Sequence, residues 1–146
     1  MKFTIASILL ATSALAAPAN VERSNTIQIS DFSAIASKIN SASMHFVVTD
    51  ANYPDDTPTD CQLLWTYGSS PKQSARCNNS QYYIRFPDGP VDFNLFTLEL
   101  ERVSGPIPEK GQAKLSSKTF PWKCVKNPKD GVNLQCNYEG VLNMSV

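Results

Sequence analysis

The sequence predicts an all-β domain, either a compact antiparallel β-barrel or a barrel-like sandwich, with two intramolecular disulfides. Apolar and polar side chains alternate along several short segments, which is the two-residue period of a strand with one buried face. Ten Pro and six Gly residues separate these segments by turns. No stretch of ten or more residues carries helical spacing, and a chain of 146 residues suits a single domain.

Residues 1–16 have the features of a secretory signal peptide. Lys2 supplies a positive charge, an apolar run follows, and Ala14-Leu15-Ala16 matches the small-residue pattern of a cleavage site. The apolar run is too short for a transmembrane helix, and no other segment is long and apolar enough. We therefore expect cleavage before Ala17, an extracellular protein and no membrane span.

The mature chain is expected to begin with a loose polar arm over residues 17–25, followed by one domain over residues 26–146. Ile27 and Ile29 start the first alternating segment. The region from Ser33 to Ser41 is expected to be a single helical turn or a loop. In the first half of the domain, the alternation predicts strands near residues 26–30, 44–48, 61–67 and 82–86.

The longest predicted strand covers residues 92–103, and its apolar phase shifts between Leu95 and Phe96. A β-bulge absorbs such a slip, and bulges allow a sheet to bend into a barrel. Residues 112–120 predict a polar strand. Apolar residues then keep one parity from Val132 to the C-terminus, with a bend expected at Gly140.

Four cysteines in a secreted chain indicate two disulfides. Three pairings are open, and the separations of 16 and 12 residues within the first and second pair suit two local bridges. A zinc site is disfavoured because the chain has no CxxC motif and a single histidine, His45. The cysteines are Cys61, Cys77, Cys124 and Cys136.

Two polar regions are candidates for other ligands or modifications. A proline-containing turn carries four carboxylates that form a weak candidate for a Ca²⁺ site, although the EF-hand spacing is absent. The alternative is that these acids are simply solvated. They are Asp50, Asp55, Asp56 and Asp60. Asn78 and Asn143 each begin an N-glycosylation sequon.

Charge is balanced overall, with 13 basic and 13 acidic residues, which argues against nucleic acid as a partner. The basic residues of the second half nevertheless cluster between Arg102 and Lys129. Trp122 is predicted to stand exposed on a disulfide-held loop, and Tyr83 is a second predicted exposed aromatic. With Lys123, Lys126 and Lys129 they form the predicted binding region, because an aromatic beside cations suits a protein or aromatic ligand. The alternative is a solvated strand face whose lysines guard a sheet edge.

The sequence gives no pattern for catalysis, so we expect a protein that is not an enzyme and has no cofactor. A pair of catalytic histidines is excluded because His45 is the single imidazole. The nucleophile motif GxSxG is absent. Thirteen acids allow a glycosidase pair, but no spacing favours one.

Several short motifs together resemble the fungal Alternaria major allergen family. Early in the mature chain they are Ile29-Ser30-Asp31-Phe32 and the strand-like segment 44–48. Near the end they are Phe120-Pro121-Trp122-Lys123-Cys124 and Asn127-Pro128-Lys129-Asp130, followed by Cys136 in an alternating segment. Together with the signal peptide and the order of the cysteines, these motifs cover most of the mature chain in outline.

The resemblance implies a compact all-β barrel in which Cys61 pairs with Cys77 and Cys124 with Cys136. It also implies a secreted fungal protein that acts at a plant surface as an effector or elicitor, by binding a host protein or provoking defence or cell death. A carrier of a small phenolic, flavonoid-like ligand is the alternative function. No cysteine is left outside the two bridges, so we expect a monomer or a non-covalent dimer.

Overall fold

The computed structural model describes residues 22–146, and the predicted signal peptide and residues 17–21 of the predicted arm lie outside this range. The described chain forms nine strands and no helix. Every strand pair is antiparallel, which confirms the all-β, antiparallel part of the predicted fold class. The strands are β1 (Thr26–Ser37), β2 (Ser41–Asp50), β3 (Thr59–Thr66), β4 (Tyr82–Arg85), β5 (Leu95–Arg102), β6 (Lys110–Ser116), β7 (Trp122–Lys129), β8 (Val132–Tyr138) and β9 (Leu142–Ser145).

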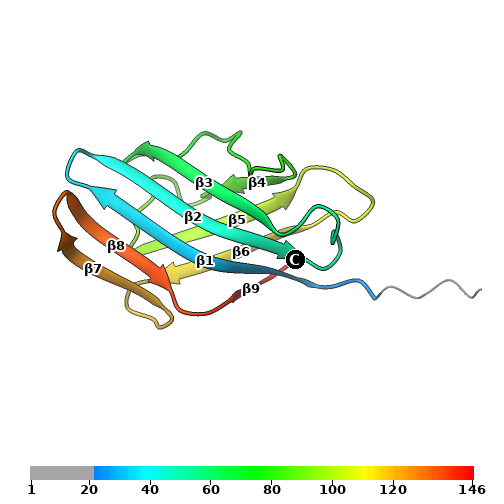
Figure 1. The fold of residues 1–146 in the computed structure, drawn as a ribbon. Coiled ribbons are helices and arrows are strands. Elements are labelled where there is room, and N and C mark those ends of the chain that lie inside the picture. Colours follow the sequence, from blue (N-terminus) through cyan, green and yellow to red (C-terminus); the bar gives the residue numbers. More distant parts are fainter. Residues whose placement is uncertain (1–21) are drawn as a thin grey trace, which may run out of the picture.

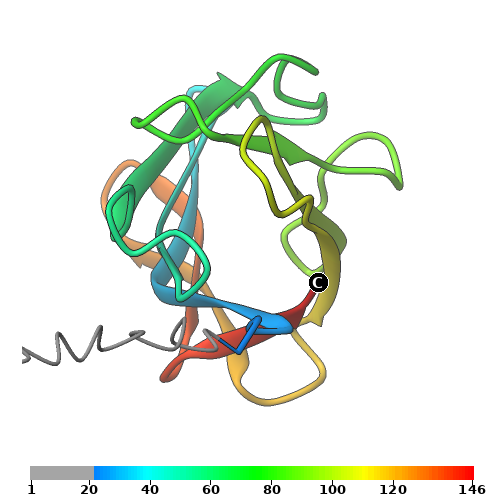
Figure 2. The ribbon, with the colours of Figure 1, turned by 90° about the vertical axis from the view of Figure 1, so that its right-hand side faces the viewer.

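The strands belong to two sheets that face each other across one core (Figures 1 and 2). The larger sheet has the order β3-β2-β1-β8-β7, with β9 pairing the first half of β1, and the smaller has the order β4-β5-β6. Within residues 22–146 neither sheet closes on itself, so the closed barrel stays a prediction. β9 lies beside β6, where Gly111 packs against the Ser145 backbone with no room for a side chain.

β1 is longer than the sequence predicts. It continues through Ser37, so the helical turn or loop expected from Ser33 is wrong, and the turn into β2 takes only residues 38–40. A bulge between Ser30 and Ser33 shifts the buried parity from Ile29 to Phe32. Asp31 occupies the bulge with φ 50°, a left-handed conformation that Asp tolerates better than most residues.

The phase shift near residue 95 has a different cause from the predicted bulge. Residues 92–94 form a turn, in which the Asp92 side chain accepts a hydrogen bond from the Asn94 amide at 2.9 Å, and β5 begins only at Leu95. Phe93 therefore packs inward from the turn, whereas Phe96 packs inward from the strand. The polar strand predicted over residues 112–120 corresponds to β6, which begins and ends earlier, at Lys110 and Ser116. The bend at Gly140 is confirmed, with φ 89° between β8 and β9.

The core between the sheets is densely aromatic. The Phe32 ring from the larger sheet lies with its centroid 6.4 Å from that of Phe96 in the smaller sheet. Phe93 and Phe96 are both almost fully buried, with ring centroids 6.5 Å apart. Large side chains of both sheets fill this space, which places candidate binding sites on the surface of the molecule.

Candidate functional site

Both disulfides have the implied pairing. Cys61 bonds Cys77, and Cys124 bonds Cys136. The second bond joins directly opposed residues of β7 and β8, with a Cα–Cα distance of 4.0 Å. The β7–β8 hairpin, which carries most of the predicted binding residues, is therefore held covalently.

Trp122 is not the exposed aromatic that the sequence predicts, because only 1% of it is accessible. Its ring centroid lies 4.9 Å from that of Phe32 and 5.5 Å from that of Phe96. The indole N–H donates to the carbonyl oxygen of Phe93 at 2.8 Å. Trp122 thus anchors the start of β7 in the core. Its shared inward parity with Cys124 is the signal that predicts this burial.

The exposed aromatic of this region is Phe120, which sequence reasoning missed. It lies in the loop before Pro121 and is 66% accessible. The Lys123 ammonium lies 5.2 Å from the centroid of the Phe120 ring and 2.8 Å from the Glu139 carboxylate. The Phe120–Pro121 peptide bond is cis. A solvent-facing ring therefore stands beside a cation on the hairpin.

Pockets that hold small molecules measure about 300–1,000 Å³, and the hollow beside Phe120 measures about 350 Å³. It lies where β6 approaches the ends of β7, β8 and β9. Aromatic rings line part of it and the Lys114 chain borders it, so its chemistry suits a flat, partly apolar molecule carrying an anionic group. The lining residues are Lys114, Leu115, Ser116, Thr119, Phe120, Pro121, Trp122, Tyr138 and Leu142.

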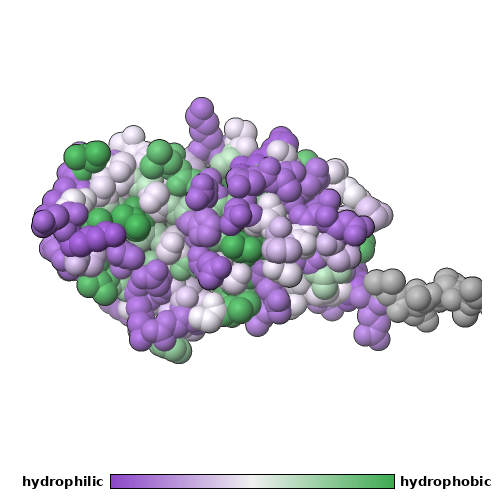
Figure 3. All heavy atoms as spheres, viewed as in Figure 1, coloured by the Kyte–Doolittle hydropathy of each residue, from purple (hydrophilic) through white to green (hydrophobic). Residues whose placement is uncertain are grey.

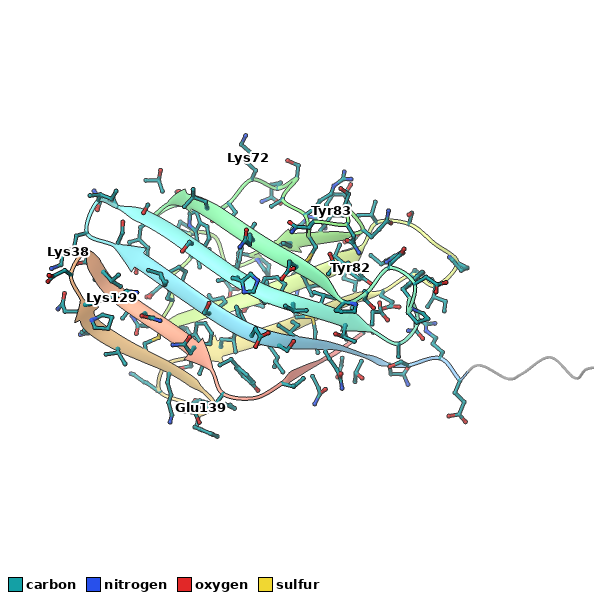
Figure 4. The ribbon with its side chains drawn as sticks, viewed as in Figure 1. Lys38, Lys72, Tyr82, Tyr83, Lys129 and Glu139 are labelled. Atoms are coloured by element: carbon teal, nitrogen blue, oxygen red, sulfur yellow. A yellow bond between two sulfur atoms is a disulfide. The ribbon has the colours of Figure 1, made fainter. Side chains whose placement is uncertain are left out.

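The other predicted lysines lie along the same hairpin. Lys126 and Lys129 are exposed on β7, and Lys38 joins them because its amide donates to the Gly131 carbonyl at 3.0 Å. Figure 4 shows Lys38 and Lys129 together at one end of the molecule. On the face seen in Figure 3, hydrophobic residues form separate clusters among hydrophilic ones. Charge is therefore the more continuous property of the hairpin.

Tyr83 does not belong to this group. It is half-buried on β4 of the smaller sheet, well apart from Lys129 in Figure 4. The guanidinium carbons of Arg76 and Arg85 lie 4.5 and 4.4 Å from its ring centroid, and its hydroxyl accepts a hydrogen bond from Arg76 at 3.0 Å. Its ring is occupied by these contacts, so the predicted grouping with Trp122 is wrong.

The four acidic residues near the proline turn do not converge on a cation. Asp50 is buried and accepts from the Tyr82 hydroxyl at 2.8 Å, whereas Asp55 is exposed. Asp56 pairs with Arg102, and Asp60 lies 3.0 Å from the His45 ring. No group of three or more potential metal ligands occurs in the described part of the chain, so the weak calcium prediction is wrong.

Asp50 instead belongs to a buried polar cluster that no sequence pattern revealed. The Asn52 amide group donates to Glu109 at 3.0 Å, and the Asn52 backbone donates to Asp50 at 2.9 Å. Arg102 lies with its guanidinium carbon 3.6 Å from the centroid of the Tyr53 ring. Burial, together with the neighbouring Asp50 carboxylate, raises the pKa of Glu109 to about 7.

Both sequon asparagines, Asn78 and Asn143, are exposed, which leaves glycosylation a prediction. Residues 22–146 contain no helix that is long and apolar enough to cross a membrane. No family model, no curated protein and no solved structure matches this chain.

Proposed function

We propose that this chain is a secreted, non-enzymatic effector or elicitor-like protein that acts at a plant surface by contacting a host protein. The fungal and plant setting rests on the resemblance of residues 120–130 and of the cysteine order to the Alternaria major allergen family. Secretion rests on the N-terminal pattern and agrees with two disulfides, which persist in oxidising compartments.

One observation carries the proposal: an exposed aromatic ring stands beside a cation at the start of a covalently held hairpin. Phe120 is 66% accessible, and Lys123 lies over its ring. Aromatic anchors contribute much of the free energy at protein interfaces, and surrounding charges steer association. The Cys124–Cys136 bond restricts the hairpin before binding, so less conformational entropy is lost on association.

The proposal is tested by applying the purified mature protein to plant tissue and scoring defence markers and cell death. Protein inactivated by heat and reduction is the control for contaminants. We expect Phe120→Ala to remove most of the response and Leu64→Ala to retain it, since Leu64 is equally apolar and 79% accessible but lies on β3. An inactive wild-type protein, or equal activity of both variants, would argue against this binding surface.

A carrier of a small phenolic ligand is the second candidate, and the cavity of about 350 Å³ beside Phe120 favours it. The aromatic core is filled, so such a ligand would bind at the surface, and the aromatic lining of this cavity makes it our candidate. We expect only a small change in melting temperature with flavonoids. A saturable rise of several degrees at micromolar ligand, lost in Tyr138→Ala, would place the carrier function first.

A further inference from the structure

The outer edge of β7 is the free edge of the larger sheet. β7 pairs only with β8, and nothing lies beyond it in the strand order. An edge strand presents backbone N–H and C=O groups that can pair with another chain. The register of the β7–β8 hairpin decides which residues present these groups.

Two observations fix that register. The Glu139 amide donates to the Pro121 carbonyl at 3.1 Å, so residues 121 and 139 form a hydrogen-bonded pair. The Cα atoms of Cys124 and Cys136 are only 4.0 Å apart, as in a non-hydrogen-bonded pair. Hydrogen-bonded and non-hydrogen-bonded pairs alternate, so Trp122, Cys124 and Lys126 direct their backbone N–H and C=O groups away from β8.

These outward groups are available for pairing. Within residues 22–146, the backbone groups of Cys124 and Lys126 have no hydrogen-bond partner outside the hairpin. Lys126 is exposed and Cys124 half-buried. The two residues lie two positions apart, the spacing at which an added strand makes successive backbone contacts. The register shift after Lys126, where Asn127 has φ 48°, ends the regular edge.

Charge selects what can pair there. Lys123, Lys126 and Lys129 follow one another along β7, and Lys118 is exposed in the loop before it. Nearby, Glu139 is already paired with Lys123. A second copy of β7 would bring these lysines together and be repelled. A strand carrying carboxylates would be attracted instead.

We infer that the β7 edge binds an extended acidic segment of a partner protein by strand addition. Backbone hydrogen bonds at Cys124 and Lys126 supply the pairing, and partner carboxylates lie beside Lys123 and Lys126. This inference rests on the proposed binding function and names the chemistry of the partner. Under this inference the lysines of β7 have two effects: they oppose self-association of the protein, and they favour the binding of acidic strands.

The test uses the full mature protein and a capped, fluorescent peptide of about seven residues that is rich in Glu and carries Glu on both strand faces, because Lys123 and Lys126 have opposite parity on β7. Fluorescence anisotropy measures its affinity. Lys126→Pro removes one outward N–H without removing a bond to β8, and Lys126→Gln removes only the charge. We expect Lys126→Pro to weaken binding about tenfold or more, and Lys126→Gln about threefold. Lys72→Gln, an exposed lysine in the loop between β3 and β4 and far from this edge in Figure 4, should bind as wild type.

Altered peptides provide a second measurement that does not depend on the folding of any variant. A peptide N-methylated at three consecutive residues cannot pair through its backbone, and one with Lys in place of Glu has the wrong charge. We expect neither to bind, and we expect hydrogen exchange to show protection of the Cys124 and Lys126 amides by the Glu peptide. Binding of the N-methylated peptide with wild-type affinity would overturn the inference.

The outcomes for the edge and for the proposed function are separable. Peptide binding by a protein that is inactive on plant tissue would retain the edge and reject the effector role. A tissue response that persists in Lys126→Pro would retain the effector role and reject the edge as its contact. Concentration-dependent dimerisation, abolished by Lys126→Pro, would show that a second copy occupies the edge and would overturn the acidic partner.

Discussion

The two outer edges of the larger sheet are treated in opposite ways, although each has a disulfide. At the β3 edge, Cys61 bonds Cys77 in a loop that crosses the edge, and the Asn78 amide donates to the Asp60 carbonyl at 2.8 Å. At the β7 edge, Cys124 bonds an inner neighbour and leaves the outside open. A disulfide therefore covers an edge only when its second cysteine lies beyond that edge.

The regions behind the two edges also differ in chemistry. Trp122 ties β7 to an aromatic cluster, whose packing does not depend on ionisation. Near the other end of the sheet, Asp50 of β2 bonds Tyr82 of β4, and Glu109 lies in the same buried network. Changes at the aromatic anchor should therefore cost stability at every pH, whereas changes in the polar cluster should act over a limited pH range.

The largest expected effect is at the aromatic anchor. Trp122→Ala removes a fully buried side chain and leaves the Phe93 carbonyl without its indole donor. We expect the free energy of unfolding to fall by about 3–5 kcal/mol. Urea denaturation followed by far-ultraviolet circular dichroism measures it. A loss below about 1 kcal/mol would contradict the buried position, because that is the scale of surface substitutions.

The two disulfides provide the next comparison. Replacing either pair by alanine should lower the free energy of unfolding by about 2–4 kcal/mol. The consequences for the edges should differ. Loss of the Cys61–Cys77 bond releases the loop that covers β3, so light scattering should detect self-association of this variant. Loss of the Cys124–Cys136 bond should produce less self-association, because the lysines of β7 repel a second copy of this edge. Equal aggregation of both variants would remove this distinction.

Local patterns in the sequence predicted much of the fold. The alternation over residues 82–86 predicts a strand, which the structure shows as β4 with Tyr82 and Ile84 buried, and the short separations favour the observed disulfides. The sequence does not predict the bulge at Asp31, because the small residues Ser and Ala after Phe32 obscure the strand period. The backbone conformation of a single bulge residue leaves little trace in the pattern of apolar and polar residues.

The site was harder to predict than the fold. The proline before Trp122 predicts a loop, yet β7 starts at Trp122 and the side chain points inward. The polar cluster joins Asp50 to Arg102 and Glu109, which lie far from it in sequence, and the three carry no shared motif. Tertiary packing brings them together, and one sequence contains no local sign of that packing.

The polar cluster predicts a pH effect of intermediate size. The folded chain keeps Glu109 protonated up to about pH 7, against an ordinary pKa of 4.5. The unfolded chain ionises first, so this group's stabilising contribution is full below 4.5 and is lost as the pH rises to about 7. Asp50, Asp56, Arg102 and Tyr82 share this network.

Glu109→Gln isolates the contribution of that carboxyl group, because the other titrating groups remain. At pH 8 we expect the variant to be about 1–3 kcal/mol more stable than the wild type, with a smaller difference at pH 5. Urea denaturation across this range measures the difference. A wild-type advantage that grows with pH would show that Glu109 is stabilised as a carboxylate, contrary to this account.

The smallest expected effect on stability is at Phe120, two residues before Trp122. Its ring is 66% accessible and contacts the Lys123 ammonium at 5.2 Å from the ring centroid. Phe120→Ala should change the free energy of unfolding by about 0.5 kcal/mol or less, since surface side chains contribute little to folding. The same variant should lose most of its activity on plant tissue. Denaturation and the tissue assay together therefore distinguish Trp122, which anchors β7 in the core, from Phe120, which contacts a partner. A stability loss close to that of Trp122→Ala would show that Phe120 also supports the hairpin, and its effect on activity would then have a structural cause.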